Sequence, residues 1–333
     1  MNKKPNQAAT NPFKNTDSNK RYYTYDYYLK KTYGGKCAKI TLDAGFTCPN
    51  IDGKCGTGGC IYCSARGSGD FAQSSHLSLR EQYDRQREII TKKWDTERFI
   101  PYLQAHTNTY APIDLLRRVY SEAVALPGAV ALHIATRADC LVQEVLLLLR
   151  EVSEQIPLTV ELGLQTIFDE TAKLINRGHT YGDFLRGYKA LRREVPKARV
   201  AMHLINGLPG EDMDMMLNSA AAVGVIGADE VKIHLLHVLK NTPLADLYKR
   251  GKYTPMTREE YIKTVAMQLT VIPSGTVIGR LTGDGAESEL LAPLWSLKKT
   301  ALLNDIDKYL FEHKFWQGIF VDNAQKDMEN FFS

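Results

Sequence analysis

The 333-residue sequence lacks any run of about 18 apolar residues, and it has no charged leader followed by an apolar segment and a small-residue cleavage site. These absences argue against membrane insertion and export, so we expect a cytoplasmic protein. No internal repeat or low-complexity linker divides the chain. With 44% hydrophobic residues, it can bury about three quarters of its unfolded surface, which suits one large domain or two small ones.

The sequence also has little excess charge of either sign. Its 42 Lys and Arg residues and 38 Asp and Glu residues give a formal net charge of +4, and the pI is about 8.6. A protein that binds nucleic acid mainly through charge has a stronger basic excess, so this value permits an RNA partner without indicating one. We expect neither DNA nor a membrane as a partner.

Cysteines are few as well. Six in a chain of this length are too few for a disulfide scaffold. Four of them fall within sixteen positions, at Cys48, Cys55, Cys60 and Cys63. This clustering favours metal binding in a reducing compartment.

The ends of the chain differ from its middle. Residues 1–20 are polar and lack an apolar period, so they are predicted to be a disordered tail, and 321–333 a short C-terminal tail. The core domain with its terminal extensions is predicted over 21–320. Residues 21–36 carry six tyrosines among basic residues. This stretch could pack against the core or stack on RNA bases, and the sequence favours packing.

From Cys37 onward, short β-branched runs alternate with longer helical patterns, an order typical of a parallel sheet with helical crossovers. Strands are predicted near 37–42, 99–104, 130–135, 158–164, 199–205, 230–235 and 276–281. Helices with one buried face are predicted over 79–94, 113–125, 142–154, 183–194, 212–223 and 257–271. Six or seven such units fall short of a full barrel. We therefore predict an α/β fold, a partial (β/α)6-type TIM barrel open on one side.

A glycine-rich loop with the four clustered cysteines follows the first predicted strand. Thiolates bind both iron-sulfur clusters and structural zinc, so spacing alone does not choose between them. A zinc ribbon needs two short cysteine pairs, whereas here only Cys60 and Cys63 form one. A loop at the carboxyl end of a barrel strand would place a metal at the catalytic mouth.

This loop, from Thr47 to Ser64, resembles that of radical S-adenosylmethionine (SAM) enzymes of the MnmL (YtqA, YhcC-like) family, relatives of the Elongator catalytic subunit. The resemblance implies the partial barrel of the radical SAM superfamily and a [4Fe-4S] cluster. By motif match Cys48, Cys60 and Cys63 are the ligands, and the remaining iron is left for the amino and carboxylate groups of SAM. Tyr62 would lie against the adenine of SAM. Cys55 stays open as a spare thiol, a redox-active residue or an alternative ligand.

The same resemblance extends to other strand ends. It implies that Gln165 and Arg177 bind SAM, in keeping with the capacity of an amide to satisfy ribose hydroxyls and of a guanidinium to capture a carboxylate. Gln104 and Asn108 would contact the amino group of SAM, with an ordinary polar turn as the alternative. Two further predicted cofactor residues lie on strands, Glu161 and His203. Glu161 would pair with a cation or with the ammonium of SAM, and His203 is either a site residue or a satisfied core histidine.

A basic group is predicted at the last strands. Strand alternation places Lys232 and His234 on one face, and Arg280 and Asp284 follow the final strand. Facing inward, the basic side chains would form a cationic pocket for a substrate carboxylate. Lys232, His234 and Arg280 are therefore the predicted catalytic residues.

The chemistry implied by the resemblance is reductive cleavage of SAM to methionine and a 5′-deoxyadenosyl radical, which abstracts hydrogen from an unactivated carbon. The resemblance also implies a tRNA substrate, with 5-carboxymethylaminomethyl-uridine at the wobble position converted to 5-aminomethyl-uridine. A separate methyltransferase would then complete the methylaminomethyl group. A reducing partner such as flavodoxin or ferredoxin would supply electrons.

Two other functions stay open, besides a structural barrel with a degenerate site, against which the inward polar groups at successive strand ends argue. One is a radical SAM enzyme acting on a small molecule such as a tetrapyrrole, which a missing tRNA footprint would indicate. The other is a zinc-binding interaction protein, which would be colourless and without affinity for SAM. The chain has no room for the acetyltransferase domain of Elongator-type proteins, so we expect no acetyl transfer.

Overall fold

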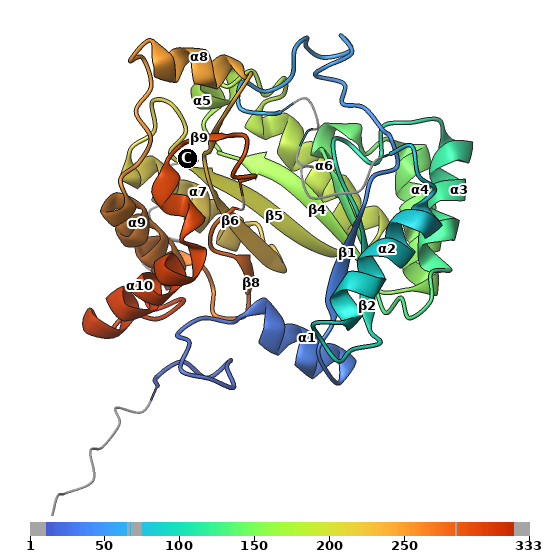
Figure 1. The fold of residues 1–333 in the computed structure, drawn as a ribbon, viewed down its shortest axis with the longest axis horizontal. Helices are drawn as coiled ribbons and strands as arrows, with labels where there is room; N and C mark the ends of the chain where they lie inside the picture. The colour runs from blue at the N-terminus through green and yellow to red at the C-terminus, as the bar shows by residue number, and fades with distance from the viewer. Residues whose placement is uncertain (1–10, 65–66, 68–74, 284, 323–333) are drawn as a thin grey trace, which may run out of the picture.

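The computed structural model describes residues 11–64, 67, 75–283 and 285–322. Its centre is one seven-stranded sheet that curls into a half-barrel with helices on its outside (Figure 1). The strands are β1 (Ala38–Leu42), β2 (Phe99–Leu103), β3 (Leu132–Thr136), β4 (Leu158–Gln165), β5 (Arg199–Asn206), β6 (Glu230–Leu235) and β8 (Val277–Arg280). They lie in that order and every neighbouring pair is parallel. Within the described ranges β8 forms no ladder with β1, so the predicted partial barrel, open on one side, is confirmed.

Helices surround the sheet, and most of them connect one strand to the next on its outer face. They are α1 (Tyr25–Tyr33), α2 (Leu79–Thr91), α3 (Ile113–Val124), α4 (Gln143–Gln155), α5 (Asp169–Leu174), α6 (Tyr181–Glu194), α7 (Met213–Val225), α8 (Pro243–Lys249), α9 (Arg258–Val271) and α10 (Lys299–Glu312). Short 3-10 helices cover Ala138–Cys140 (η1) and Leu294–Leu297 (η2). The six predicted helices are confirmed, and capping boxes at the starts of α2, α6 and α9 fix where three of them begin.

Strand alternation separates an apolar outside from a polar inside. On β4, Val160 and Leu162 are fully buried in the same core cluster as Leu149 of α4 and Leu191 of α6. Glu161, between them, points to the interior of the barrel, because successive side chains of a strand face opposite ways. The sheet therefore forms the main core with its outer face and offers polar groups on its inner face.

The tyrosine-rich segment closes the amino-terminal end of the barrel. Tyr23 accepts a backbone hydrogen bond from Ile278 of β8 (2.8 Å), and the Tyr25 hydroxyl lies 3.4 Å from Nε2 of His133 on β3. The guanidinium of Arg199, at the start of β5, lies 4.1 Å from the ring centroid of Tyr28. These contacts confirm that the segment packs against the barrel.

Several elements go beyond the sequence prediction. Strands β7 (Val238–Leu239) and β9 (Leu290–Ala292) form a small antiparallel sheet near α8. Residues 11–20, within the segment predicted as a disordered tail, are described: Phe13 is buried and Lys20 forms an ion pair with Asp307 of α10. None of the helices in the described ranges has the length and apolarity needed to cross a bilayer.

Candidate active site

A cavity of about 690 Å³ runs through the interior of the half-barrel. It extends from the cysteine loop at the carboxyl ends of the strands to Tyr25 and Lys36 near the amino ends. The predicted site residues that line it are Cys48, Cys60, Tyr62, Cys63, Gln104, Glu161, Gln165, Arg177, His203, Lys232, His234 and Arg280. The structure therefore brings together side chains that are spread over more than two hundred positions of the sequence.

Two predicted residues are not placed at this cavity. Asn108 is buried beside it, where its amide donates to the carbonyls of Ala105 (2.8 Å) and Ala135 (3.0 Å). Its observed contacts hold the β2–α3 loop against β3. Asp284 lies outside the described residues.

The cysteine loop is fixed to the segment between α5 and α6. Asn50 is fully buried and donates to the Asn176 carbonyl (2.5 Å), while the Asn176 amide donates to the Gly59 carbonyl (2.7 Å). The Cys63 amide donates to the Cys60 carbonyl (3.0 Å), which makes the tight turn between these two cysteines. The positions of the thiols are thus set by backbone and amide contacts of the loop itself.

The environment of Cys60 favours the thiolate form that binds metal, at the expense of Cys63, whose pKa is raised by its hydrogen bond to Cys60 and by burial. A hydrogen bond from the Cys63 thiol lowers the pKa of Cys60 to about 5, and the guanidinium groups of Arg177 and Arg137 act in the same direction against burial. In the described part of the chain, no three His, Cys, Asp or Glu side chains surround one point as the ligands of a single ion would. Cluster thiolates bind separate irons and need not converge in that way, so the three cysteines fit an iron-sulfur cluster.

Cys55 occupies a different environment from the other three cysteines of the loop. Its sulfur accepts a hydrogen bond from Nη2 of Arg137 (3.5 Å), and Arg137 also donates to the Arg177 carbonyl (2.9 Å). Asp139 accepts two further bonds from the same guanidinium (2.9 and 2.8 Å). Cys55 is absent from the lining of the active-site cavity. The Arg137 guanidinium therefore ties the cysteine loop to the end of β3.

The side chains of Gln165 and Arg177 both lie close to Gly163. A bulge between Gly163 and Gln165 interrupts the β4–β5 register and redirects the end of β4. Arg177 is buried and donates through Nη2 to the Gly163 carbonyl (2.6 Å), while its Nε and the Gln165 Oε1 are buried with no hydrogen-bond partner among the described residues. A Cβ at position 163 would lie 2.8 Å from Gln165 Nε2 and 3.1 Å from Arg177 Nη2. A donor and an acceptor are thus left to a ligand, which fits a molecule with carboxylate and hydroxyl groups such as SAM.

Glu161 stands at the centre of a buried charge cluster. Its Oε1 accepts from Lys39 Nζ (2.9 Å) and lies 2.7 Å from His133 Nδ1. Its Oε2 contacts Lys232 Nζ and lies 2.9 Å from His203 Nε2. Burial alone would raise the pKa of Glu161, but the Lys232 and Lys39 ammonium groups outweigh it and hold that pKa well below its usual range. The carboxylate is therefore charged, and the prediction that Glu161 pairs with a cation is confirmed.

Burial lowers the pKa values of the basic side chains around this carboxylate. Desolvation lowers the pKa of Lys232 to about 8, that of His203 to about 4 and that of His133 to about 3. His234 stacks on His203 with ring centroids 5.0 Å apart, and its pKa is lowered well below the usual range by burial. Both imidazoles are therefore uncharged near neutral pH and can donate or accept a hydrogen bond.

Glu230 is a second carboxylate in the same layer of the barrel. It is fully buried, and neither of its oxygens has a hydrogen-bond partner among the described residues. Burial raises its pKa, while Lys39 and Lys232 act in the opposite direction. Two carboxylates thus share two ammonium groups, and only Glu161 is bonded to them.

Sequence reasoning missed Lys39, His133 and Tyr102 in this cluster. Both ammonium groups lie near the Tyr102 ring, whose centroid is 4.9 Å from Lys39 Nζ and 5.0 Å from Lys232 Nζ. The missed residues sit on β1, β2 and β3 at the positions that face the barrel interior. A charged or imidazole side chain inside a short apolar strand was the signal that could have found Lys39 and His133.

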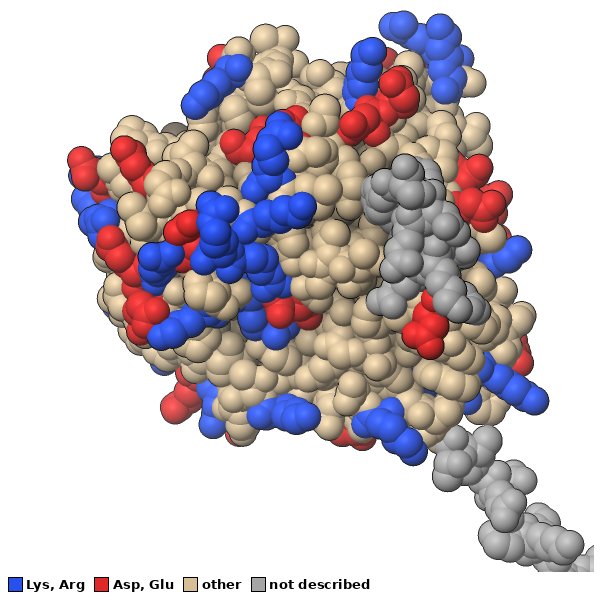
Figure 2. Space-filling model, turned by 180° about the vertical axis from the view of Figure 1, so that it is seen from behind, with Lys and Arg blue, Asp and Glu red and all other residues tan. Residues whose placement is uncertain are grey.

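Charge on the outer surface is mixed. Figure 2 shows lysine and arginine side chains gathered on part of the back face, with acidic side chains among them. Several outer arginines are paired, as in Arg150 with Glu194 and Arg192 with Asp229, each at 2.8 Å. The structure agrees in this respect with the modest net charge of the sequence.

Comparison with known proteins gives a consistent result. The family model for the radical SAM superfamily matches residues 52–223, and the model for the radical SAM C-terminal domain matches residues 228–312. The uncharacterized protein YtqA of Bacillus subtilis (strain 168) is 41% identical over 317 residues, which cover 95% of this chain and 98% of YtqA.

Two archaeal proteins are more distant. The tRNA uridine(34) acetyltransferase of Methanocaldococcus jannaschii is 31% identical over 190 residues, 55% of this chain and 33% of that protein. The structure of Methanocaldococcus infernus Elp3 lacking residues 1–46 superposes with a TM-score of 0.63 at 20% identity, covering 84% of this chain and 64% of that chain. This second likeness is one of fold.

Proposed function

This chain belongs to the YtqA-like family of the radical SAM superfamily, whose members bind a [4Fe-4S] cluster and SAM, and we propose that it is a tRNA-modifying enzyme. The single observation that carries the proposal is the cavity that joins three cysteines, two unpartnered SAM-type contacts and a group of basic side chains. We also propose that the core extends over 21–320, a range that contains both matched family regions.

We propose Cys48, Cys60 and Cys63 as the cluster ligands. When bound and reduced by an external donor such as flavodoxin or ferredoxin, the cluster supplies the electron that cleaves SAM to methionine and a 5′-deoxyadenosyl radical, which abstracts hydrogen from an unactivated carbon. The work of the protein is to hold the three thiolates, to orient SAM and the reacting carbon, and to keep water out of the barrel.

The proposed SAM contacts follow from buried polar atoms that have no hydrogen-bond partner among the described residues. Arg177 offers its free Nε to the SAM carboxylate, and Gln165 offers its Oε1 to a hydroxyl. Tyr62 and Gln104 line the same end of the cavity and would contact the adenine and the amino group. His203, neutral and bonded to Glu161, would accept or donate at the inner side.

For the substrate we propose the wobble uridine of tRNA, with 5-carboxymethylaminomethyl-uridine converted to 5-aminomethyl-uridine. The support is the similarity to a relative named as acting on uridine 34 of tRNA and the open side of the barrel. A downstream methyltransferase would add the methyl group. Arg280, exposed at the end of β8, is the proposed first contact of the substrate carboxylate, with His234 and Lys232 deeper in the cavity.

The test is conversion of the modified base by anaerobically prepared holoenzyme. Wild type, reductant and SAM are incubated with tRNA carrying 5-carboxymethylaminomethyl-uridine, and the nucleosides are quantified by mass spectrometry. Arg280→Met should lose most conversion, whereas Arg186→Met on the outer surface of α6 should retain it. If wild type forms 5′-deoxyadenosine but does not convert the base, this substrate is refuted. The result would then favour a radical SAM enzyme that acts on a small molecule.

A further inference from the structure

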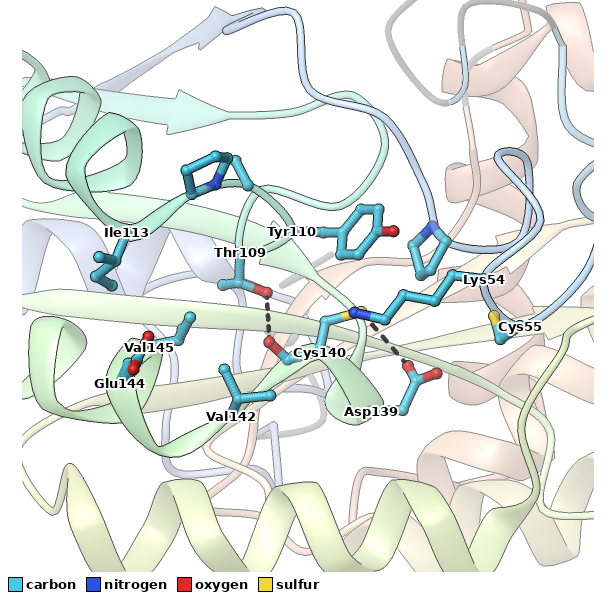
Figure 3. A pocket seen from close by; sticks show the side chains of 13 residues that line it. Lys54, Cys55, Thr109, Tyr110, Ile113, Asp139, Cys140, Val142, Glu144 and Val145 are labelled. Carbon is cyan, nitrogen blue, oxygen red and sulfur yellow. Dashed lines mark hydrogen bonds between the residues drawn. The ribbon is translucent and has the colours of Figure 1, made fainter.

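A second cavity lies beside the active-site cavity. It has a volume of about 590 Å³ and is formed by the cysteine loop, the turn between β2 and α3, and the turn between η1 and α4 (Figure 3). Cys55 lines it, whereas the residues predicted as cluster ligands, SAM contacts or catalytic groups do not. It is large enough to bury a planar ring of the size of a nucleobase.

The two cavities share one wall. On each of three segments, two residues one or two positions apart line different cavities. Cys48, Thr107 and Arg137 line the active-site cavity, while Pro49, Thr109 and Asp139 line the second. A group bound in the second cavity would therefore contact the cysteine loop directly and be separated from the active-site cavity by the shared wall.

The walls of the second cavity are mostly apolar and include one aromatic ring. Tyr110 lies at its centre, with Lys54 on one side and Ile113 and Val145 on the other (Figure 3). Lys54 Nζ lies 5.0 Å from the ring centroid of Tyr110. Val142 at the rim is 57% exposed, a high fraction for a valine. Such a combination of an aromatic face with exposed aliphatic groups suits the stacking of a flat ring.

Polar groups at the edges narrow the chemistry of the ligand. Lys54 provides a donor and the Glu144 carboxylate an acceptor, while the Asp139 carboxylate is engaged by the guanidinium of Arg137. The Glu144 carboxylate offsets the Lys54 ammonium, so the lining offers no excess positive charge to a phosphate, whereas a neutral base presents both donors and acceptors along its edges. The cavity therefore suits a nucleobase better than a backbone phosphate.

We propose that this cavity binds a base of the tRNA that neighbours the modified uridine, with Tyr110 as the stacking residue. The inference rests on the proposed function, because it requires an RNA substrate. A splayed-out loop places adjacent bases within one nucleotide of each other, which matches two cavities that share a wall. The second cavity would then hold the anticodon loop in register while the target base enters the barrel.

The experiment uses holoenzyme and anticodon stem-loops with 2-aminopurine on either side of the wobble position. With wild type, fluorescence at one of the two positions should fall on binding, because the base stacks on Tyr110. Tyr110→Ala should abolish that change and weaken binding by about 5- to 150-fold, the range for loss of one base–aromatic stack. Tyr110→Phe keeps the ring and loses only the hydroxyl contact with Asp52, so it should retain the fluorescence change.

Two further variants guard against a general loss of structure. Val142→Glu adds a charge at the exposed rim and should also weaken binding. Phe311→Ala removes an aromatic ring that is 58% exposed on α10 and should bind like wild type. All variants should form 5′-deoxyadenosine from SAM without RNA as wild type does, which shows an intact active site.

The outcomes separate the inference from the proposed function. If wild type binds and converts the tRNA but neither base responds and Tyr110→Ala binds equally well, the second cavity is not a base site. If wild type does not bind the stem-loop at all, the RNA substrate itself is refuted.

Discussion

The Lys232 ammonium on β6 donates to the Glu161 carboxylate on β4 inside the barrel, where both side chains are buried. We predicted Lys232 as a catalytic residue that contacts the substrate, and the structure shows its charge already engaged by a protein carboxylate. Any effect of Lys232 on the substrate must therefore be judged together with Glu161. Arg280 remains the more exposed cation of the predicted pocket.

The first prediction concerns this pair. Glu161→Gln removes the carboxylate bonded to the half-buried Lys39 and the buried Lys232 and leaves them only the unbonded Glu230, so it should lower the free energy of unfolding by about 3 kcal/mol. Glu230→Gln is the matched control, since it removes a buried carboxylate without hydrogen-bond partners and should be neutral or stabilising. Urea unfolding at pH 8 measures both variants. Equal destabilisation by the two substitutions would contradict the assigned pairing.

The second prediction concerns the glycine beneath the SAM contacts. Gly163→Ala introduces a Cβ that would lie 2.8 Å from Gln165 Nε2, so both this side chain and Arg177 must shift. We expect SAM affinity to fall about tenfold or more, as the loss of one good polar contact predicts, while the fold is kept. Gly275→Ala, which meets no atom within 4 Å, is the control. Calorimetric titration with SAM measures the affinity of both variants. Equal affinities would show that SAM binds elsewhere.

The third prediction concerns pH and a carboxyl group away from the site. Burial raises the pKa of Glu211 from its usual 4.5 to about 7, against hydrogen bonds from Thr166 and Thr171. Between these two pH values the folded state keeps a proton that the unfolded state has lost, so stability falls as pH rises through this window. The free energy of unfolding of Glu211→Gln should therefore decrease less between pH 5 and pH 8 than that of wild type, by about 1–2 kcal/mol when partial exposure is allowed for. Urea unfolding at pH 5 and pH 8 tests this, and an identical pH dependence in the variant would disprove the shifted pKa.

Periodicity was sufficient to predict the barrel. Each of the seven strands carries an apolar run that packs on the outer helices, as Val160 and Leu162 do on β4. Helix α10 was missed although Leu302, Ile306 and Leu310 recur at intervals of four and are buried. Strands β7 and β9 are two and three residues long, too short for any period to appear.

Only the site residues that stand in local sequence motifs at the ends of strands could be predicted. Cys60, Gln165 and Arg177 stand in recognisable local motifs, and the structure brings them together at one cavity. The partners of Glu161 and the contact of Arg137 with Cys55 join residues 28 to 122 positions apart. Such contacts depend on strand register and curl, which local sequence does not encode.

The most direct test of the account is anaerobic reconstitution followed by determination of iron, sulfide and zinc. It is applied to wild type and to Cys48→Ala, Cys60→Ala, Cys63→Ala and Cys55→Ala, and 5′-deoxyadenosine is measured after reduction with SAM. Wild type and Cys55→Ala should each hold about four irons and form 5′-deoxyadenosine, whereas the other three variants should lose both. Stoichiometric zinc without iron in wild type, or loss of the cluster in Cys55→Ala alone, would contradict the account.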